Sequence, residues 1–314
     1  MQLMFYNARG HDRELTPKQL PRIRITAESL LWINVTPEEL AKLTLPKAVA
    51  EPLAQCPPEP DLVRVHAKCY SLQLPVLSGH GDSAPLSLGI VVGPEWLVSI
   101  GEGTAIDFAD LIASDVGETM KGRISGSTLA AALIADHFTR IHGRIGTINR
   151  EIDRIEERIL LGEERRNTLQ VMAVLRRQVS RLRNLVGAYR GLVTSLTRPD
   201  FLPVIDQEDR DHFTHLLSGF ERLEDEVARL REGVVESFEL YATRVAQDTN
   251  RLLRTLTFFT IGIGLIGALA GIFGMNFKAA IFEKGDQGFY LATIIMAVIM
   301  ASTGAVAIFT YRRP

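Results

Sequence analysis

The stretch NRLLRTLTFFTIGIGLIGALAGIFGMNF, residues 250–277, decides the fold of this 314-residue chain. No charged residue lies between Arg254 and Lys278, an interval of 23 residues. A second uncharged interval, of 25 residues, separates Asp286 from Arg312. A helix needs about 20 apolar residues to cross a bilayer, at a rise of about 1.5 Å per residue. The sequence therefore predicts two transmembrane helices within residues 255–314.

A heptad pattern precedes the first span. Apolar residues recur at alternating spacings of three and four at Phe213, Leu216, Phe220, Leu223, Val227, Leu230 and Val234. The pattern then shifts by one residue and continues at Val235, Phe238, Ala242, Val245, Thr249, Leu252 and Leu256. No proline interrupts residues 204–313. These features predict one continuous stalk helix from about residue 206 to residue 273, about 100 Å long, that runs directly into the membrane.

Two further helices are predicted over residues 127–161 and 165–196, and they are rich in arginine. Residues 140–198 hold 13 arginines and six acids, whereas residues 201–250 hold 12 acids and five arginines. We expect the acidic stalk to pack beside the two basic helices, through exposed ion pairs that are individually weak.

The N-terminal part of the chain has a different character. Eleven of the 14 prolines lie in the first 94 residues, and proline breaks helix interiors. Thr36, followed by Pro37 and Glu39, is typical of a capped helix start. Strands are predicted over residues 22–26, 29–35, 64–75, 87–93 and 95–101. The sequence thus indicates an α/β domain over 1–125, a helical region with the stalk over 126–254, and a two-span membrane domain over 255–314.

Composition excludes several classes of protein. With 35 basic and 37 acidic residues, the chain is not a broadly basic nucleic-acid binder. Cys56 and Cys69 have no CxxC spacing, which argues against a disulfide scaffold or a structural zinc site. The N-terminal residues contain no long apolar run, so no cleavable targeting segment is expected. The sequence has no P-loop, nucleophile elbow, HExxH or dinucleotide fingerprint, so we expect neither an enzyme nor a catalytic cofactor.

Charge also predicts the topology. Arg244, Arg251 and Arg254 precede the first span, and Arg312 and Arg313 follow the second. The connecting loop, 278–286, holds two lysines and two acids and is neutral. Positive residues favour the cytoplasmic side. Both termini are therefore predicted to be cytoplasmic.

The first span carries a stripe of glycines. Gly264, Gly267 and Gly271 share one helix face. Such a stripe is compatible with close helix packing, and also with a smooth wall that leaves room for a hydrated ion. Two helices cannot enclose a pore, so the second interpretation requires an oligomer.

GIFGMNF, at the end of the first of two C-terminal spans, resembles the GMN signature of the CorA family of divalent-cation channels. WINVTPEEL, GPEWLVSIGEG and INREIDRIEERI also resemble that family, so the likeness extends over essentially the whole chain. LRRQVSRLRNLVGAYRGLVTSL and DQEDRDHF are more similar to the zinc-transporting ZntB branch. The chain departs from the family in having glycines where a proline is common in the first span, and in its nearly neutral outward loop.

The resemblance implies a homopentamer in a bacterial-type inner membrane, with a funnel-shaped cytoplasmic domain and a pore lined by the first span. It places Gly274, Met275 and Asn276 in a selectivity filter at the outer mouth. Leu253 and Leu256 would form a hydrophobic gate, although the heptad allows ordinary seam packing for both. Glu239 and Asp248 would bind a regulatory magnesium, with exposed charge as the alternative. The residues expected to face the pore are Asn250, Leu253, Leu256, Thr260, Gly264, Gly267 and Gly271.

The identity of the cation stays open at this point. No cysteine or histidine follows His215, so the spans offer zinc no soft ligand. Mg²⁺ is therefore the first expectation, with Co²⁺, Ni²⁺ or Zn²⁺ as further cargoes. The alternatives are a ZntB-like, proton-coupled zinc transporter and, from another class, a membrane-tethered helical scaffold or sensor without transport.

Overall fold

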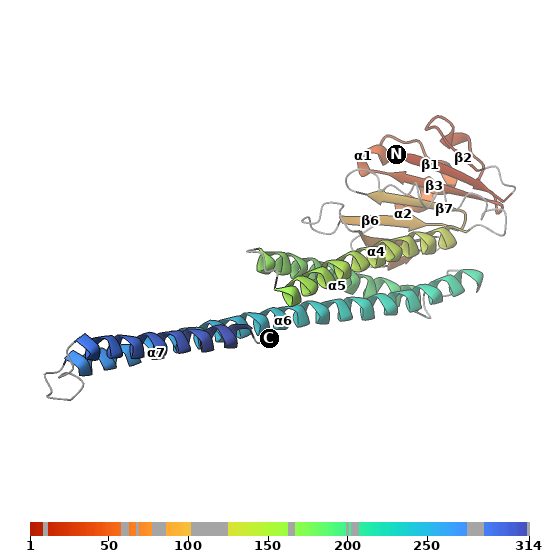
Figure 1. The fold of residues 1–314 in the computed structure, drawn as a ribbon. Coiled ribbons are helices and arrows are strands. Elements are labelled where there is room, and N and C mark those ends of the chain that lie inside the picture. The colour runs from red at the N-terminus through yellow and green to blue at the C-terminus, as the bar shows by residue number, and fades with distance from the viewer. Residues whose placement is uncertain are drawn as a thin grey trace. The chain divides into compact units, whose positions relative to one another are not determined.

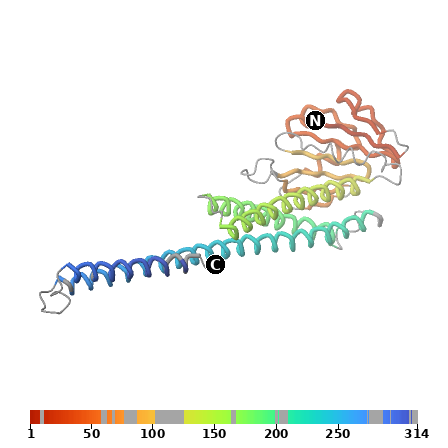
Figure 2. Tube along the Cα trace, viewed as in Figure 1, coloured from red at the N-terminus to blue at the C-terminus, as the bar shows by residue number. Residues whose placement is uncertain are grey.

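The computed structural model of the chain describes residues 1–8, 12–57, 63–66, 69–76, 86–101, 125–162, 167–198, 201, 207–274 and 286–312. The chain divides into two compact units. The first comprises Met1–Ile155 and Arg165–Glu236, and the second comprises Glu156–Glu164 and Ser237–Pro314. Helices α4 (Gly126–Leu161) and α6 (Gln207–Gly274) each contribute residues to both units (Figures 1 and 2).

A mixed β-sheet forms the N-terminal part of the first unit. The order of its strands is β2-β1-β3-β7-β6-β5-β4, and β3 with β7 is its parallel pair. The strands are β1 (Gln2–Asn7), β2 (Arg13–Glu14), β3 (Ser29–Val35), β4 (Val63–His66), β5 (Cys69–Val76), β6 (Leu86–Val92) and β7 (Trp96–Gly101). This sheet, the helices and the C-terminal hairpin confirm the predicted fold class, an α/β domain followed by long helices.

Two predicted strands in this part need correction, and two elements were not predicted. Residues 64–75 do not form one strand, because they contain two strands, β4 and β5, that pair antiparallel. Of the predicted strand 22–26, Arg22 ends a short 3₁₀ helix, η1 (Leu20–Arg22), and residues 23–26 pair with no strand among the described residues, although Ile23 and Ile25 pack against the core. Strand β1 was not predicted. Helix α2 (Lys47–Gln55) was also missed, because Pro52 lies inside it. Its buried Val49 shows that packing outweighs the cost of that proline.

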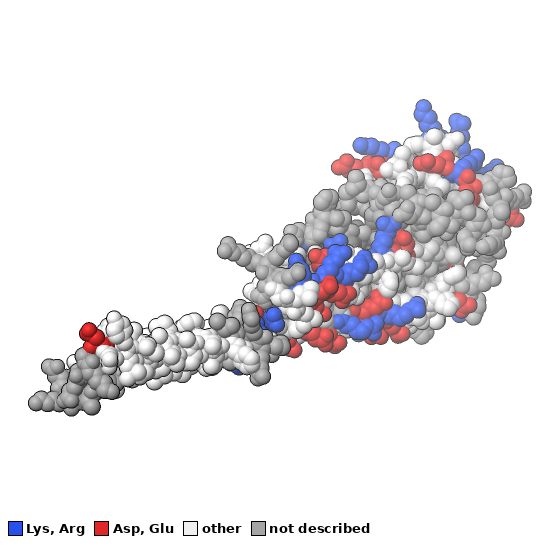
Figure 3. Space-filling model, viewed as in Figure 1, with Lys and Arg blue, Asp and Glu red and all other residues white. Residues whose placement is uncertain are grey.

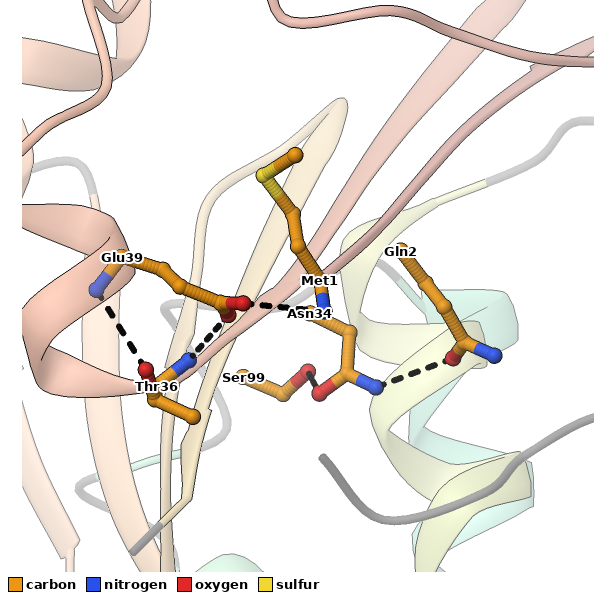
Figure 4. A network of polar contacts seen from close by, with 6 residues as sticks. All are labelled: Met1, Gln2, Asn34, Thr36, Glu39 and Ser99. Carbon is orange, nitrogen blue, oxygen red and sulfur yellow. Dashed lines mark hydrogen bonds and ion pairs between the residues drawn. The ribbon is translucent and has the colours of Figure 1, made fainter. Parts of the chain in front are cut away.

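The predicted helix start at Thr36 is confirmed as α1 (Pro37–Leu40). Thr36 Oγ1 accepts from the Glu39 backbone N–H at 3.3 Å, and Glu39 Oε2 accepts from the Thr36 N–H at 3.0 Å. The amino group of Met1 lies 3.3 Å from Glu39 Oε1 (Figure 4). Because the backbone N–H of Thr36 stabilises the carboxylate, the pKa of Glu39 is lowered. This network ties the first residue of the chain to the end of β3.

Both faces of the interior strand β3 are buried. Leu31, Ile33 and Val35 face a core that includes Leu3, Val49 and Val98. On the other face, Trp32 Nε1 donates to Ser99 Oγ, which donates to Asn34 Oδ1, both at 3.0 Å. Asn34 in turn donates to Gln2 Oε1 (Figure 4). These contacts satisfy buried polar groups that would otherwise destabilise the sheet.

Helices α4, α5 (Thr168–Leu196) and the first half of α6 complete the first unit, and their limits lie close to those predicted. Helices α4 and α6 run parallel, because Thr128 contacts Asp209 and, farther along both helices, His142 contacts Glu226. Arg190 on α5 pairs with Glu224 on α6 at 2.6 Å. Figure 3 shows basic and acidic side chains mixed over these helices. The predicted packing of the acidic stalk beside basic helices is therefore found.

The start of α4 packs so closely against the β6–β7 turn that position 126 has no room for a side chain. A Cβ on Gly126 would overlap the backbone carbonyl of Gly93 and lie 2.7 Å from that of Trp96. Ser125 caps the helix, because its Oγ accepts from the Thr128 N–H at 2.9 Å. Asp209 of α6 accepts from Ser125 Oγ at 2.8 Å and from Thr128 Oγ1 at 2.7 Å. A buried carboxylate beside a helix N-terminus is electrostatically favourable.

The second unit contains the end of α4, the rest of α6 and helix α7 (Asp286–Arg312). Helices α6 and α7 lie side by side, joined by residues 275–285 (Figures 1 and 2). The predicted stalk helix of 206–273 is confirmed as the single 68-residue helix α6.

Candidate functional site

Helices α6 and α7 are both long and apolar enough to cross a membrane. Their apolar side chains point outward: Leu256, Ile263 and Leu265 on α6 are exposed, as are Ile294, Val298 and Met300 on α7. The visible surface of this hairpin is almost entirely uncharged (Figure 3). Such a surface is stable only when lipid or another protein chain covers it.

One glycine of α6 forms the close contact with α7, and it lies outside the predicted stripe. Gly262 is buried, and a Cβ there would lie 2.9 Å from Thr303 Oγ1 on α7. A Cβ on Gly264, Gly267 or Gly271 would meet no described atom within 4 Å. The glycine stripe is therefore not used for packing between the two spans of one chain.

The residues predicted to face a pore lie on the side of α6 opposite Gly262. At about 100° per residue, they cluster within about 60° of the direction opposite that glycine. All of them are exposed in the single chain: Asn250, Leu253, Leu256, Thr260, Gly264, Gly267 and Gly271. Thr260 donates its hydroxyl hydrogen to the Leu256 carbonyl at 2.9 Å, and its oxygen can still accept a hydrogen bond. The helix thus has one face against α7 and an opposite face without a partner in the described chain.

Nearer the N-terminus, α6 has an apolar contact seam within its own chain. The seven predicted heptad residues from Phe213 to Val234 are all buried in the first unit. Phe220 packs near Phe138 of α4, with 6.3 Å between the ring centroids. The same spacing continues in the second unit at Ser237, Tyr241, Arg244, Asp248, Arg251, Thr255, Phe258 and Gly262, and all of these except the exposed Arg251 are buried or half-buried. The contact seam does not shift, but its side chains are polar from Ser237 to Thr255, before Phe258 and Gly262.

Polar groups mediate the contact between the end of α4 and α6 in the second unit. Ser237 Oγ, which is buried, donates to Glu156 Oε1 at 2.5 Å. A Cβ on Gly162 would lie 3.0 Å from an Arg244 nitrogen, and Arg244 pairs with Asp248 at 3.6 Å. This contact resembles a surface interface more than a core.

The residues of the shifted heptad lie on the neighbouring face of α6, which is largely exposed. Leu252 is 68% exposed and Leu256 61%, and Val235 and Val245 are exposed as well. The shift by one residue in the sequence is therefore a change of face. Apolar residues leave the seam within the chain and form a second seam, which we call the outer seam: Val235, Phe238, Ala242, Val245, Thr249, Leu252 and Leu256.

The two acids predicted to bind a regulatory ion lie far apart around α6. Glu239 is exposed, whereas Asp248 is half-buried and paired with Arg244. Nine residues separate them, which places them on opposite sides of the helix, about 180° apart. Within the described parts of the chain, no three His, Cys, Asp or Glu side chains converge on a metal position.

The predicted filter lies at the end of α6. Gly274 is the last residue of that helix. Met275 and Asn276 lie outside the described residues, so their predicted role rests on the sequence.

Comparison with known proteins decides the family. The family model described as "CorA-like Mg2+ transporter protein" matches residues 28–312. The chain belongs to this family. The resemblance of the GMN stretch and of the N-terminal segments is thereby confirmed.

The cobalt/magnesium transport protein CorA of Thermotoga maritima is 28% identical to the chain over 172 residues. The aligned stretch covers 55% of the chain and 47% of that relative, so the chain spans about half the length of this curated CorA-family protein. The complete structure of the CorA magnesium transporter from Methanocaldococcus jannaschii matches 100% of the chain and 98% of its own length, with a TM-score of 0.71 and 21% identity. The cytoplasmic domain of ZntB from Vibrio parahaemolyticus covers 78% of the chain and 98% of its own length, with a TM-score of 0.56 and 12% identity. At these identities the two structures establish a shared CorA-like fold.

The contacts that sequence reasoning missed are those between Gly262 and Thr303 and between Ser237 and Glu156. Gly262 is one of five glycines between residues 262 and 274, and nothing in its neighbours marks it as the one that meets α7. Ser237 does carry a signal, because it occupies the place of the next apolar residue when the first heptad is continued without a shift.

Proposed function

We propose that this chain assembles into a homopentamer that conducts divalent cations across a bacterial-type inner membrane, with α6 lining the pathway. The observation that carries the proposal is the division of α6 into two opposite faces. Gly262 meets α7 of the same chain, while the glycine stripe and Thr260 are exposed. Because two helices cannot enclose a pore, the exposed face requires further copies to line a pathway.

The outer seam supports assembly from copies of the same chain. Its heptad spacing is that of coiled coils, in which apolar side chains of neighbouring helices interlock. In a symmetric ring, each copy would present the outer seam to its neighbour and the glycine stripe to the axis. The apolar surface of the spans would then face lipid, with both termini cytoplasmic, as the arginines predict.

The side chains on the exposed face suit a hydrated hard cation. Mg²⁺ gives up its water reluctantly, so a ring of Asn276 amide oxygens would accept hydrogen bonds from its hydration shell. Below the filter, Gly271, Gly267 and Gly264 leave space for that shell. At the cytoplasmic end, Leu253 and Leu256 would form a constriction that opens and closes by wetting. The cargo is proposed as Mg²⁺ first, with Co²⁺, Ni²⁺ and Zn²⁺ as candidates, and Glu239 and Asp248 are proposed to hold a regulatory ion between subunits.

The test is ion flux into liposomes that contain the purified, full-length protein. Mg²⁺ influx that does not depend on a pH gradient, and that is lost in Asn276→Ala without loss of assembly, would support the proposal. Replacement of Leu253 and Leu256 by serine should raise the leak of cations. Normal uptake by Asn276→Ala would refute the filter, and unchanged flux in the serine variant would refute the gate.

The same vesicles distinguish the two alternatives. Zn²⁺ influx that increases with an imposed pH gradient would favour proton-coupled zinc transport. Absence of flux for every divalent cation, from correctly inserted and assembled protein, would favour a tethered scaffold or sensor.

A further inference from the structure

The contact between the two spans of one chain is concentrated at Gly262 and Thr303. Gly262 is the one buried residue of α6 among residues 255–272. A Cβ at this position would meet three atoms of Thr303: Oγ1 at 2.9 Å, Cβ at 3.3 Å and Cγ2 at 3.4 Å. At these separations either the Thr303 side chain or one of the two helices has to shift.

The side chain of Thr303 is held in place by its own helix. Its hydroxyl donates to the carbonyl of Ile299 at 2.9 Å and lies 3.0 Å from that of Met300. These backbone contacts fix the rotamer, since in lipid the hydroxyl has no better partner. Thr303 therefore cannot swing aside at no cost, and its Cβ, which a change of rotamer does not move, would still lie 3.3 Å from the added carbon.

The position of this contact relates it to the proposed pathway. Gly262 lies between Thr260 and Gly264 in sequence, and its side of α6 is opposite theirs. We infer that Gly262 and Thr303 are positioning residues that set how far α6 stands from the axis of the pathway at the level of Thr260 and Gly264. This inference rests on the proposed function. An atom added at Gly262 pushes α6 away from α7, and in a symmetric ring every copy moves toward the axis together.

The test is a double-mutant cycle in the full-length protein. Wild type, Gly262→Ala, Thr303→Ala and the double variant are reconstituted in vesicles of three parts phosphatidylcholine to one part phosphatidylglycerol, and Mg²⁺ influx is measured. Gly262→Ala should lower the maximal rate by about fivefold or more with little change in half-saturating Mg²⁺. Thr303→Ala removes Oγ1 and Cγ2, so the double variant should recover to within about twofold of wild type.

Gly264→Ala is the matched control, because it adds the same methyl group two residues away, on the opposite, exposed face of α6. Its effect on flux, whatever the size, should not be relieved by Thr303→Ala. Light scattering on each detergent-solubilised variant shows whether a change in rate reflects lost assembly.

The outcomes separate the inference from the proposed function. If wild type conducts Mg²⁺ and Asn276→Ala does not, the function stands. In that case, a Gly262→Ala variant that is unaffected, or that Thr303→Ala fails to rescue, overturns the positioning role alone. If correctly assembled wild type moves no divalent cation, both fail together.

Discussion

The two halves of α6 keep the same heptad spacing, but the side chains that they bury differ in polarity. From Phe213 to Val234 the seam within the chain is apolar and packs against α4 and α5. From Ser237 to Thr255 the same seam is polar, and the apolar residues of this stretch lie on the outer seam. The boundary coincides with the division between the two compact units, at Glu236 and Ser237. The difference teaches that one unbroken helix can have two kinds of partner, its own chain in one half and, as we propose, other copies in the next.

The strongest test of this difference between the two halves is a charge placed on the outer seam. Val245→Asp should abolish assembly, because each copy would bury an unpaired carboxylate; we expect the assembled fraction to fall by about tenfold or more. Size-exclusion chromatography with light scattering measures this. Val174→Asp, on α5, is the control, since the exposure of Val174 (42%) is close to that of Val245 (39%). Intact oligomers of Val245→Asp would refute the outer seam as an interface.

The apolar, N-terminal half of α6 is tested by a substitution that creates a cavity. Phe220→Ala should destabilise the first unit by about 3–5 kcal/mol, because Phe220 is buried and packs near the ring of Phe138. Urea unfolding followed by tryptophan fluorescence reports on this unit, since the two tryptophans of the chain, Trp32 and Trp96, both lie in its sheet. Leu252→Ala in the other half should leave that transition within about 0.5 kcal/mol of wild type. Equal losses in the two variants would contradict the distinction between the halves.

Acid should also act on the first unit, through His137 of α4. Burial lowers the pKa of His137 to about 4. The charge of Asp136 raises this pKa, and the charge of Arg140 lowers it by a smaller amount. The folded state thus prefers the neutral ring. The stability that the neutral His137 contributes to the folded state is fully present above about pH 6.5. The free energy of unfolding falls as the pH drops from about 6.5 to about 4, by at most about 3 kcal/mol. The difference in unfolding free energy between wild type and His137→Leu, measured across this range, should show the loss. A difference that does not change with pH would rule it out.

The smallest effect is expected at the polar contact of the second unit. Ser237→Ala leaves the Glu156 carboxylate without its hydroxyl donor, which should cost about 1–2 kcal/mol locally. Hydrogen exchange in peptides that cover the end of α4 should then accelerate. Thr249→Ala is the control, because the exposed hydroxyl of Thr249 bonds only to the Val245 carbonyl of its own helix among the contacts described. Unchanged exchange in Ser237→Ala would mean that this bond does not hold the end of α4.

The long helices could be predicted well from the sequence, because their signals are local. Heptad spacing and the absence of proline act within a few residues of one another, as do Thr36 and Glu39 at the start of the short helix α1. The limits of α4, α5 and α6 accordingly lie within a few residues of those predicted. The alternation of Ile23 and Ile25 did indicate burial, but a strand also needs a neighbour, and no local pattern supplies one.

The site was less predictable, because its features depend on which face of a helix meets which partner. The sequence placed Gly264, Gly267 and Gly271 on one face, yet it could not tell packing from a pore wall. The structure shows that the stripe does not pack against α7 of the same chain, because Thr303, about 40 residues away in the sequence, meets Gly262 instead. Likewise, the shift at Val235 was visible, but only the position of α4 shows that it separates two surfaces.

The close contact between Gly126, at the start of α4, and the β6–β7 turn limits which residues the sequence can have at these positions. The obstacles to a side chain at position 126 are backbone carbonyls of Gly93 and Trp96, which no substitution can remove. At position 93 the obstacle is the indole ring of Trp96, which a smaller residue would withdraw. In related sequences that keep this turn, position 126 should therefore always be glycine, whereas the residues at positions 93 and 96 should covary.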